Sequence, residues 1–512
     1  MTHTLSNPLK EWNPQLLREL KGRLKPLNIS IAIAISLIAQ FVIVDSLEYD
    51  WFNIFIVLSL SAMTAILAFG TFMLISDLDQ EERRGTLDFI RLTPQSGTHL
   101  FIGKLLGVPC ILYLAVALAI PLQLWSGLLS GFNLVETLGF DIILILRSVF
   151  VLSLALLFGL VKGNLSGLKP WLASAFVLFC LFVFMVIFPH SPTLNNAWDA
   201  IKIFSPSPLL PYFLSESPQQ QIFDRSAEYY ITELQSLRWF YLPIGANVVS
   251  LSLFYLVNYL AWTRLTWQGI NRLFQNPTAT IISKRQSYII TAAFTLLSLG
   301  FSLKNFGLIN YILLISQSIL VFFALIAALL PNRLTLQDWL QDYPVKLKNK
   351  QDFISDLIWG EKSPAILAIA INLTIISVPT GLITLFSVNS FDEQCRILLG
   401  LFLNASFILL CASLAQLLLL MKTKRRALWT TGILSALIIL PPILFSIFQL
   451  YPHQSTMFFL FSALFFIAIK EAAIPSLIVV FIGQALILTV LNQQFVRQLK
   501  MMRKSRSKTL AS

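Results

Sequence analysis

Residues Asp77 to Lys104 read DLDQEERRGTLDFIRLTPQSGTHLFIGK and form the most informative polar interruption in a mostly apolar sequence. The stretch begins acidic, becomes basic at Arg83 and Arg84, and bends at Gly85, a residue type that commonly ends helices. A short amphipathic turn follows, and Thr93-Pro94 ends it. The pattern predicts a docking element between two membrane helices rather than a catalytic site.

The composition excludes a soluble globular chain. Hydrophobic residues make up 56% of the 512 residues and charged residues only 12%, whereas soluble proteins carry about 25% charged residues. Apolar runs of about 20 residues recur, and each is long enough to cross a hydrocarbon core of ~30 Å. Because these runs do not alternate polar and apolar residues, they also exclude an outer-membrane barrel. The sequence therefore predicts an all-α polytopic membrane protein.

The distribution of lysine and arginine orients the expected helices. Of the 37 basic residues, 30 fall on the side of the membrane that carries the N-terminus, and five fall on the other side. Since basic loops stay in the cytoplasm, both termini are expected there and the number of spans is even. The dispersal of these residues among loops argues against nucleic-acid binding, despite a net charge of +12. The expected spans number about twelve: 28–44, 52–76, 104–125, 138–161, 170–189, 240–262, 288–303, 306–330, 365–388, 396–421, 428–449 and 474–491.

Two further segments lie outside the expected spans, and the even number of spans decides how the more C-terminal one is interpreted. Residues 455–473 contain a run apolar enough to cross, but a crossing would place the basic tail, 492–512, outside the cell. We therefore expect a re-entrant or outer-leaflet helix there, the alternative being that a different weak span fails to cross. The segment 190–239, rich in Pro and Ser, is expected to cap the outer end of the membrane domain.

The two halves of the chain share a layout. Asn13 and Pro14 can begin a basic amphipathic helix that lies in the headgroup layer before the first six spans. Because each half holds an even number of spans, we expect two parallel six-helix repeats about an axis along the membrane normal, with chance similarity of layout as the alternative. The predicted segments are an interfacial helix within 1–27, spans within 28–262, a second interfacial segment at 263–287, spans within 288–491, and cytoplasmic coupling segments at 77–104 and 331–364.

Two places in the first half resemble the permease subunits of ABC-2 type transporters. Residues 13–24, NPQLLRELKGRL, are similar to the interfacial helix at the start of such permeases. Residues 81–94, EERRGTLDFIRLTP, followed by IGKLLG at 102–107, are similar to the family's pattern of acidic residues, Gly-Thr-Leu, a Thr-Pro stop and a Gly-Lys-Leu start of the third helix. In that family the segment after the second span is a coupling helix, which sits in a groove of a separate ATPase subunit.

The resemblance implies partners and contact residues. ATP and Mg would bind to a cytoplasmic ATPase subunit, and this chain would bind no cofactor. Since the family usually works as a dimer of six-span permeases, twelve spans imply a fused pseudo-dimer within one chain, a homodimer being the other arrangement. The second segment departs from the pattern because Leu334 stands where Gly85 stands in the first. The residues implied to face the ATPase are Glu81, Glu82, Arg83, Arg84, Gly85, Thr86, Leu87 and Phe89.

The residues alone predict no catalytic site and no metal site. Residues 97–104 bring Gly and Lys together, but Leu105 follows where a P-loop needs Ser or Thr, and no strand precedes them. The four histidines are scattered and do not stand at ligand spacing. ATP hydrolysis, if the chain uses it, must therefore come from a partner chain.

Arg147 lies inside the fourth expected span. A charge at that depth costs at least ~2.5–3.5 kcal/mol unless it is paired or hydrated. Asp141 is six residues away and off the same helical face, so it is not an obvious partner. Arg147 either contacts an anionic substrate head group or a hydrated path, or it belongs to an interhelical pair or a misplaced span boundary.

We expect a permease rather than an enzyme, located in the bacterial plasma membrane among its lipids. The family resemblance implies that it exports its substrate, which we expect to be lipid-like, a glycan or another amphiphile. One alternative is an ion-coupled secondary transporter, which would place acidic residues or broken helices near the midplane, and these spans are poor in acidic residues. The other is a non-transporting membrane scaffold that keeps the docking segment for assembly.

The charge distribution predicts that both coupling segments lie in the cytoplasm. Single cysteines placed in 77–104 and in 331–364 should react with a membrane-impermeant thiol reagent only after the cells are permeabilised. Labelling of the 331–364 cysteine in intact cells would refute the two parallel repeats.

Overall fold

The computed structural model describes residues 12–92, 96–161, 167–187, 194–206, 209, 232–346, 350–423 and 425–511. Within these ranges the chain forms helices and no strand. Eleven helices are long and apolar enough to cross a membrane, as expected of a polytopic helical membrane protein. The chain divides into two compact units, namely Met1–Leu194 with Ile201–Arg238 and Leu242–Pro277, and Asn195–Ala200 with Trp239–Tyr241 and Thr278–Ser512.

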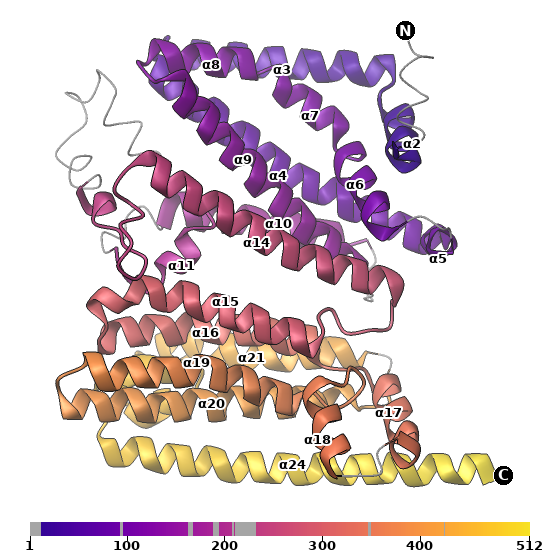
Figure 1. The fold of residues 1–512 in the computed structure, drawn as a ribbon, viewed down its shortest axis with the longest axis vertical. Coiled ribbons are helices and arrows are strands. Elements are labelled where there is room, and N and C mark those ends of the chain that lie inside the picture. The colour runs from indigo at the N-terminus through magenta and orange to yellow at the C-terminus, as the bar shows by residue number, and fades with distance from the viewer. Residues whose placement is uncertain are drawn as a thin grey trace. The chain divides into compact units, whose positions relative to one another are not determined.

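Unit 1 is built around α9, which packs against α4 on one side and α14 on the other, while α4 also packs against α8 and α10 (Figure 1). Tyr255 and Tyr259 of α14 are fully buried, and the ring of Tyr259 lies 6.1 Å from that of Phe150 in α9. The helices up to residue 275 are α2 (Pro14–Arg23), α3 (Pro26–Ser46), α4 (Trp51–Arg84), α5 (Thr86–Arg91), α6 (Gly97–Gly107), α7 (Cys110–Ala117), α8 (Ile120–Leu129), α9 (Leu134–Leu160), α10 (Lys169–Phe182), the π-helical turn η1 (Val183–Ile187), α11 (Asp199–Lys202) and α14 (Val248–Gln275).

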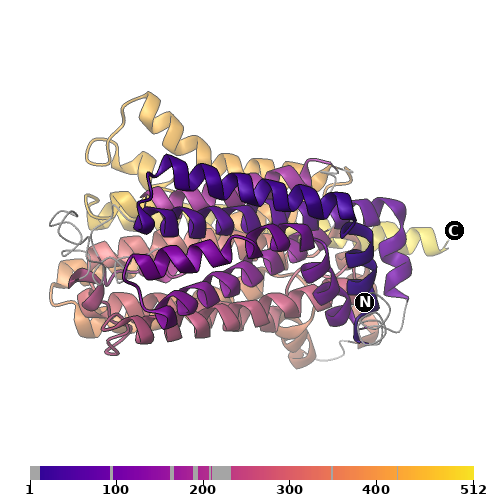
Figure 2. The ribbon, with the colours of Figure 1, turned by 90° about the horizontal axis from the view of Figure 1, so that it is seen from above.

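Unit 2 is built around α20, which packs against α16, α19, α21 and α24. Buried amides join its helices. For example, Asn372 Nδ2 donates a hydrogen bond to Ser287 Oγ at 2.9 Å. Such polar side chains commonly hold membrane helices together. Figure 2 shows the long helices of this unit, in pink to yellow, running side by side. Its helices are α15 (Lys284–Ser302), the 3-10 turn η5 (Leu303–Asn305), α16 (Leu308–Leu329), α17 (Arg333–Lys346), α18 (Lys350–Trp359), α19 (Ile366–Ser387), α20 (Phe391–Leu419), α21 (Arg426–Ile447), α22 (Thr456–Leu460), α23 (Phe465–Ala468) and α24 (Ile474–Ala511).

The fifth expected span, 170–189, is helical as far as Ile187, and its last two residues lie outside the described residues. Its apolar stretch, Lys169–Met185, has 17 residues and would cover only ~26 Å at 1.5 Å per residue, against a hydrocarbon core of ~30 Å. A turn at Gly167 (φ 87°) and Pro170 in the first helical turn fix where α10 begins. The described residues thus hold eleven full-length spans rather than twelve, and the even number of crossings stays a prediction.

Two other spans have different boundaries from those predicted. The third, 104–125, is broken near Pro109 and Pro121, because proline lacks the N–H that a continuous helix needs, and the span is Cys110–Leu129. The sixth, 240–262, is instead α14, which starts where Asn247 Oδ1 accepts a hydrogen bond from the Ser250 N–H at 2.8 Å. Because α14 continues to Gln275, residues 263–275 belong to it, and no separate interfacial helix precedes α15.

The remaining predicted segments are seen in part. Residues 455–473 contain two short helices, α22 and α23, neither long enough to cross a membrane, so their dip into the bilayer stays a prediction. Of the predicted outer segment 190–239, residues 194–206, 209 and 232–239 are described, and the rest lies outside the described residues. The basic tail at 492–512 is a helical continuation of α24 as far as Ala511.

The predicted helix within 1–27 is present as α2, and two glycines allow it to lie directly on α6. Asn13 caps α2 as predicted, since its Oδ1 accepts a hydrogen bond from the Leu16 N–H at 2.9 Å, and its Nδ2 donates to the His99 carbonyl at 2.6 Å. A Cβ on Gly103 would lie 2.7 Å from Asn13 Oδ1, and one on Gly107 would lie 2.5 Å from the Cβ of Glu19. The Gly-Lys-Leu-Leu-Gly sequence is therefore a small-residue contact surface for α2.

This contact predicts opposite effects for two glycine substitutions. Gly103→Ala should lower the free energy of unfolding by ~1–3 kcal/mol, because the new methyl group must displace the capped start of α2. Gly139→Ala, in α9, meets no atom within 4 Å and should raise stability by up to ~1 kcal/mol. Thermal unfolding in detergent measures both, and equal stability of the two variants would contradict the α2–α6 packing.

Candidate functional site

Helix α4 is longer than a membrane is thick. Its 34 residues cover ~51 Å, against ~30 Å of hydrocarbon, so its charged last turns lie outside the apolar core. Gly85 ends the helix in the left-handed conformation (φ 69°, ψ 4°), as the predicted bend requires, and α5 begins at the next residue (Figure 1). Any other residue at position 85 would be strained in this conformation.

The structure places the eight residues predicted to face an ATPase in different surroundings. Gly85, Thr86 and Phe89 are exposed, and 71% of Phe89 is accessible. Leu87 is buried, with 4% accessible, and therefore anchors α5 to its own chain. Glu81 has 13% of its side chain accessible and forms ion pairs within the chain.

The other predicted contact residues likewise differ in exposure and in their partners. Glu82 is half-buried and Arg84 is exposed. Arg83 is exposed, but its guanidinium pairs at 2.7 Å with Asp79, which also accepts a hydrogen bond from the Gly167 N–H at 3.2 Å. The Thr93-Pro94 stop lies outside the described residues.

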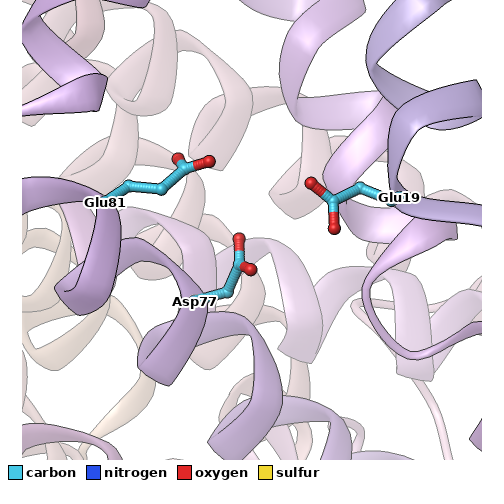
Figure 3. Close-up of side chains that lie close together, drawn as sticks. All are labelled: Glu19, Asp77 and Glu81. Carbon is cyan, nitrogen blue, oxygen red and sulfur yellow. The ribbon is translucent and has the colours of Figure 1, made fainter. Parts of the chain in front are cut away.

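Three carboxylates converge where α2 meets the last turns of α4, and Figure 3 shows Glu19, Asp77 and Glu81 directed toward one another. Lys104, the neighbour of Gly103 in α6, is fully buried beside them. Its Nζ lies 2.6 Å from Asp77 Oδ2 and 2.8 Å from Glu81 Oε2. One ammonium group therefore joins α6 to two successive turns of α4.

Two arginines of α2 complete the ion-pair network. Arg23 NH2 lies 2.8 Å from Asp77 Oδ1, and its Nε lies 3.2 Å from Glu19 Oε2. Arg18 NH2 lies 2.8 Å from Glu81 Oε1 and 3.2 Å from Glu19 Oε1. Burial by itself would lower the pKa of Arg18, but the carboxylates of Glu19 and Glu81 outweigh burial and raise it. The network thus ties α2 to α4 through the direct ion pairs Arg23–Asp77 and Arg18–Glu81.

The same three carboxylates have a spacing that could hold a metal ion, since their oxygens lie within 4.8 Å of one another. Three cationic side chains already neutralise them, because Lys104, Arg23 and Arg18 each contact two of the three. A divalent cation would have to displace the buried Lys104 ammonium. The arrangement therefore fits a structural tie better than a metal site.

The sequence contains signals of this network that the charge pattern alone does not reveal. The charge pattern predicts Lys104 at the start of a membrane span and Glu81 facing a partner. The informative signal is the spacing of Gly103 and Gly107 on either side of Lys104, because two glycines four residues apart mark a close helix contact. Asp77 and Glu81 are likewise four apart, on one face of α4.

Arg147 is placed at the centre of unit 1. It is 3% accessible and lies thirteen residues from each end of α9, so a misplaced span boundary does not explain it. Its NH1 lies 2.9 Å from the Met63 sulfur, and its Nε is buried without a hydrogen-bond partner. Among the described residues no carboxylate pairs with it, and Asp141 instead accepts a hydrogen bond from Gln123 at 2.7 Å.

The second predicted coupling segment, 331–364, is folded onto unit 2. Leu336 of α17 is fully buried in a cluster with Leu420, Phe495 and Met502, the last two from α24. Trp339 Nε1 donates to Asp356 of α18 at 2.6 Å. Unlike α5, this segment is a pair of helices held against its own unit.

No family model, curated protein or solved structure matches this chain.

Because of this ion-pair network, loss of the Lys104 ammonium group should strongly lower the stability of the protein. Lys104→Met should lower the free energy of unfolding by ~3–5 kcal/mol, because Asp77 and Glu81 lose a buried partner and repel each other. Lys21→Met, on the exposed face of α2, should change it by less than ~0.5 kcal/mol. Thermal unfolding of the purified chain measures both, and a Lys104→Met variant as stable as the control would refute the network.

Proposed function

We propose that the chain is the membrane-spanning permease of an ABC-2 type transporter, driven by ATP hydrolysis on a separate ATPase subunit. The observation that carries the proposal is α5, a short helix at the end of α4 whose Phe89 and Leu92 are 71% and 84% accessible. Exposed apolar side chains beside the charged residues Arg83 and Arg84 are typical of a protein-docking surface. The resemblance of residues 81–94 to a coupling helix names the partner.

The ion-pair network gives this docking surface a mechanical connection. An ATPase dimer that closes on ATP and Mg would push or pull on α5. Because Leu87 anchors α5 and Lys104 joins α4 to α6, the load passes to α4 and α6 together. Arg18 and Arg23 pass it to α2, so three elements would move as one body.

The location of the chain, the direction of transport, the site of ATP binding and the arrangement of the units follow from the family resemblance. The chain would lie in the bacterial plasma membrane with both termini in the cytoplasm and would export an amphiphilic substrate. ATP and Mg would bind the partner alone. The two units would act as a fused pseudo-dimer with unequal docking segments, since α5 projects from α4 while α17 is packed against α24.

Docking at α5 predicts that one exposed side chain controls ATPase binding. Phe89→Asp should reduce the amount of ATPase that co-purifies with the tagged chain at least tenfold, because a carboxylate would replace an apolar anchor in the contact. Leu334→Asp is the matched control, since Leu334 is also exposed (65%) and lies at the start of α17.

The stability of both variants should equal that of the wild type, because neither side chain is buried. If no ATP-binding chain co-purifies with the wild type, the chain is a secondary transporter or a scaffold rather than an ABC-2 permease. If Phe89→Asp and Leu334→Asp reduce binding equally, the two segments dock equally and the predicted inequality is wrong.

A further inference from the structure

Three buried lysines of this chain have oxygen partners, whereas the buried Arg147 has none among the described residues. Lys104 contacts two carboxylates, and Lys169 Nζ donates to the carbonyls of Gly159 and Val161 at 2.6 and 2.7 Å. Lys284 Nζ has three oxygen partners, the nearest being the Leu357 carbonyl at 2.6 Å. Arg147, in contrast, has a sulfur contact and an Nε without a partner.

Arg147 lies too deep in unit 1 to be an interfacial arginine. It is ~20 Å from either end of α9, so its guanidinium cannot reach the headgroup layer. The hydroxyl groups of Tyr255 and Tyr259, which lie nearby on α14, donate instead to the carbonyls of Ser205 and Phe204 at 2.8 and 3.0 Å. Intramembrane charges are retained mainly where they serve a substrate or an ion.

The side chains around Arg147 are mostly apolar. Met63, which touches the guanidinium, belongs to a buried cluster with Leu67 and Leu181. A hydrated inorganic anion would lose its water there without gaining polar contacts, apart from the arginine itself. A ligand that matches the surroundings carries one negative group for the guanidinium and hydrocarbon for the rest.

Helix α10 and η1 contribute side chains to the Met63 cluster beside Arg147. α10 packs against α4, and its outward face is open, with Phe176 and Phe179 66% and 62% accessible. Met185, in the π-helical turn η1, packs on the Met63 cluster. Because α10 has one packed face and one open face, its movement away from α4 would break contacts on one side only.

We propose that Arg147 binds the anionic head group of an amphiphilic substrate, which enters from the lipid when α10 and η1 move away from α4. This inference rests on the proposed transport function and selects, among lipid-like, glycan and other amphiphilic substrates, those with a negative charge. The guanidinium is held among apolar side chains, beside the Met63 sulfur.

Thermal unfolding of the purified chain in dodecyl maltoside tests the proposal, with dodecyl phosphate as the anionic probe and dodecanol as its neutral counterpart. Dodecyl phosphate should raise the unfolding temperature of the wild type by several degrees, because a ligand that binds only the folded state stabilises it, while dodecanol should not. Arg147→Met should unfold at a higher temperature than the wild type and show no phosphate-dependent shift. Arg147→Lys should keep part of the shift.

Arg264→Met, at an exposed position of α14, is the matched control and should keep the whole shift. The proposal is overturned if Arg147→Met unfolds at a lower temperature than the wild type, since Arg147 would then be structural. It is equally overturned if the wild type shows no shift or if the Arg147→Met variant keeps it. These measurements need no ATPase, so they stay distinct from the co-purification result that tests the transport function.

Discussion

The rest of unit 1 depends on two ion pairs. In these, the buried ammonium group of Lys104 contacts the carboxylates of Asp77 and Glu81. A charge in such a place is stable only while its partners stay in contact, because separation would leave ions buried and unpaired. The last turns of α4 therefore cannot move away from α6 independently. Through Arg18 and Arg23, the same constraint extends to α2. A load applied at α5 would therefore be shared by α2, α4 and α6.

The two predicted docking segments each have buried and exposed apolar residues, but they differ in how they are folded. In the first, Leu87 is buried and Phe89 and Leu92 are exposed at the end of a projecting helix. In the second, Leu336 and Trp339 are buried within a helical pair that packs on α24. A surface that is already covered by its own chain has less area to offer a partner. The two segments, which occupy similar places in the sequence, are thus packed differently, the first as a short helix after α4 and the second as a helical pair on α24.

The sequence predicts most features that depend on local patterns. The helical class, the capping of α2 by Asn13 and the bend at Gly85 follow from residue types and their spacing, and the structure confirms them. The network cannot be predicted with the same reasoning, because Glu19, Asp77 and Lys104 are joined by contacts between separate helices. The start of α10 depends on the turn at Gly167, and the start of α14 depends on the Asn247 cap. Hydropathy detects neither of them. Arg147 is unusual from the sequence alone, but its lack of an acidic partner depends on the surrounding helices.

The central claim is that α5 contacts a separate ATP-hydrolysing chain. A photo-crosslinking amino acid placed at position 89 of the full chain, in its native membrane, tests this claim most directly when the crosslinked products are identified by mass spectrometry. The account predicts a crosslink to a soluble ATP-binding chain that is lost when the Gly85 bend is removed. Crosslinks found only to lipid or to this chain itself would contradict it.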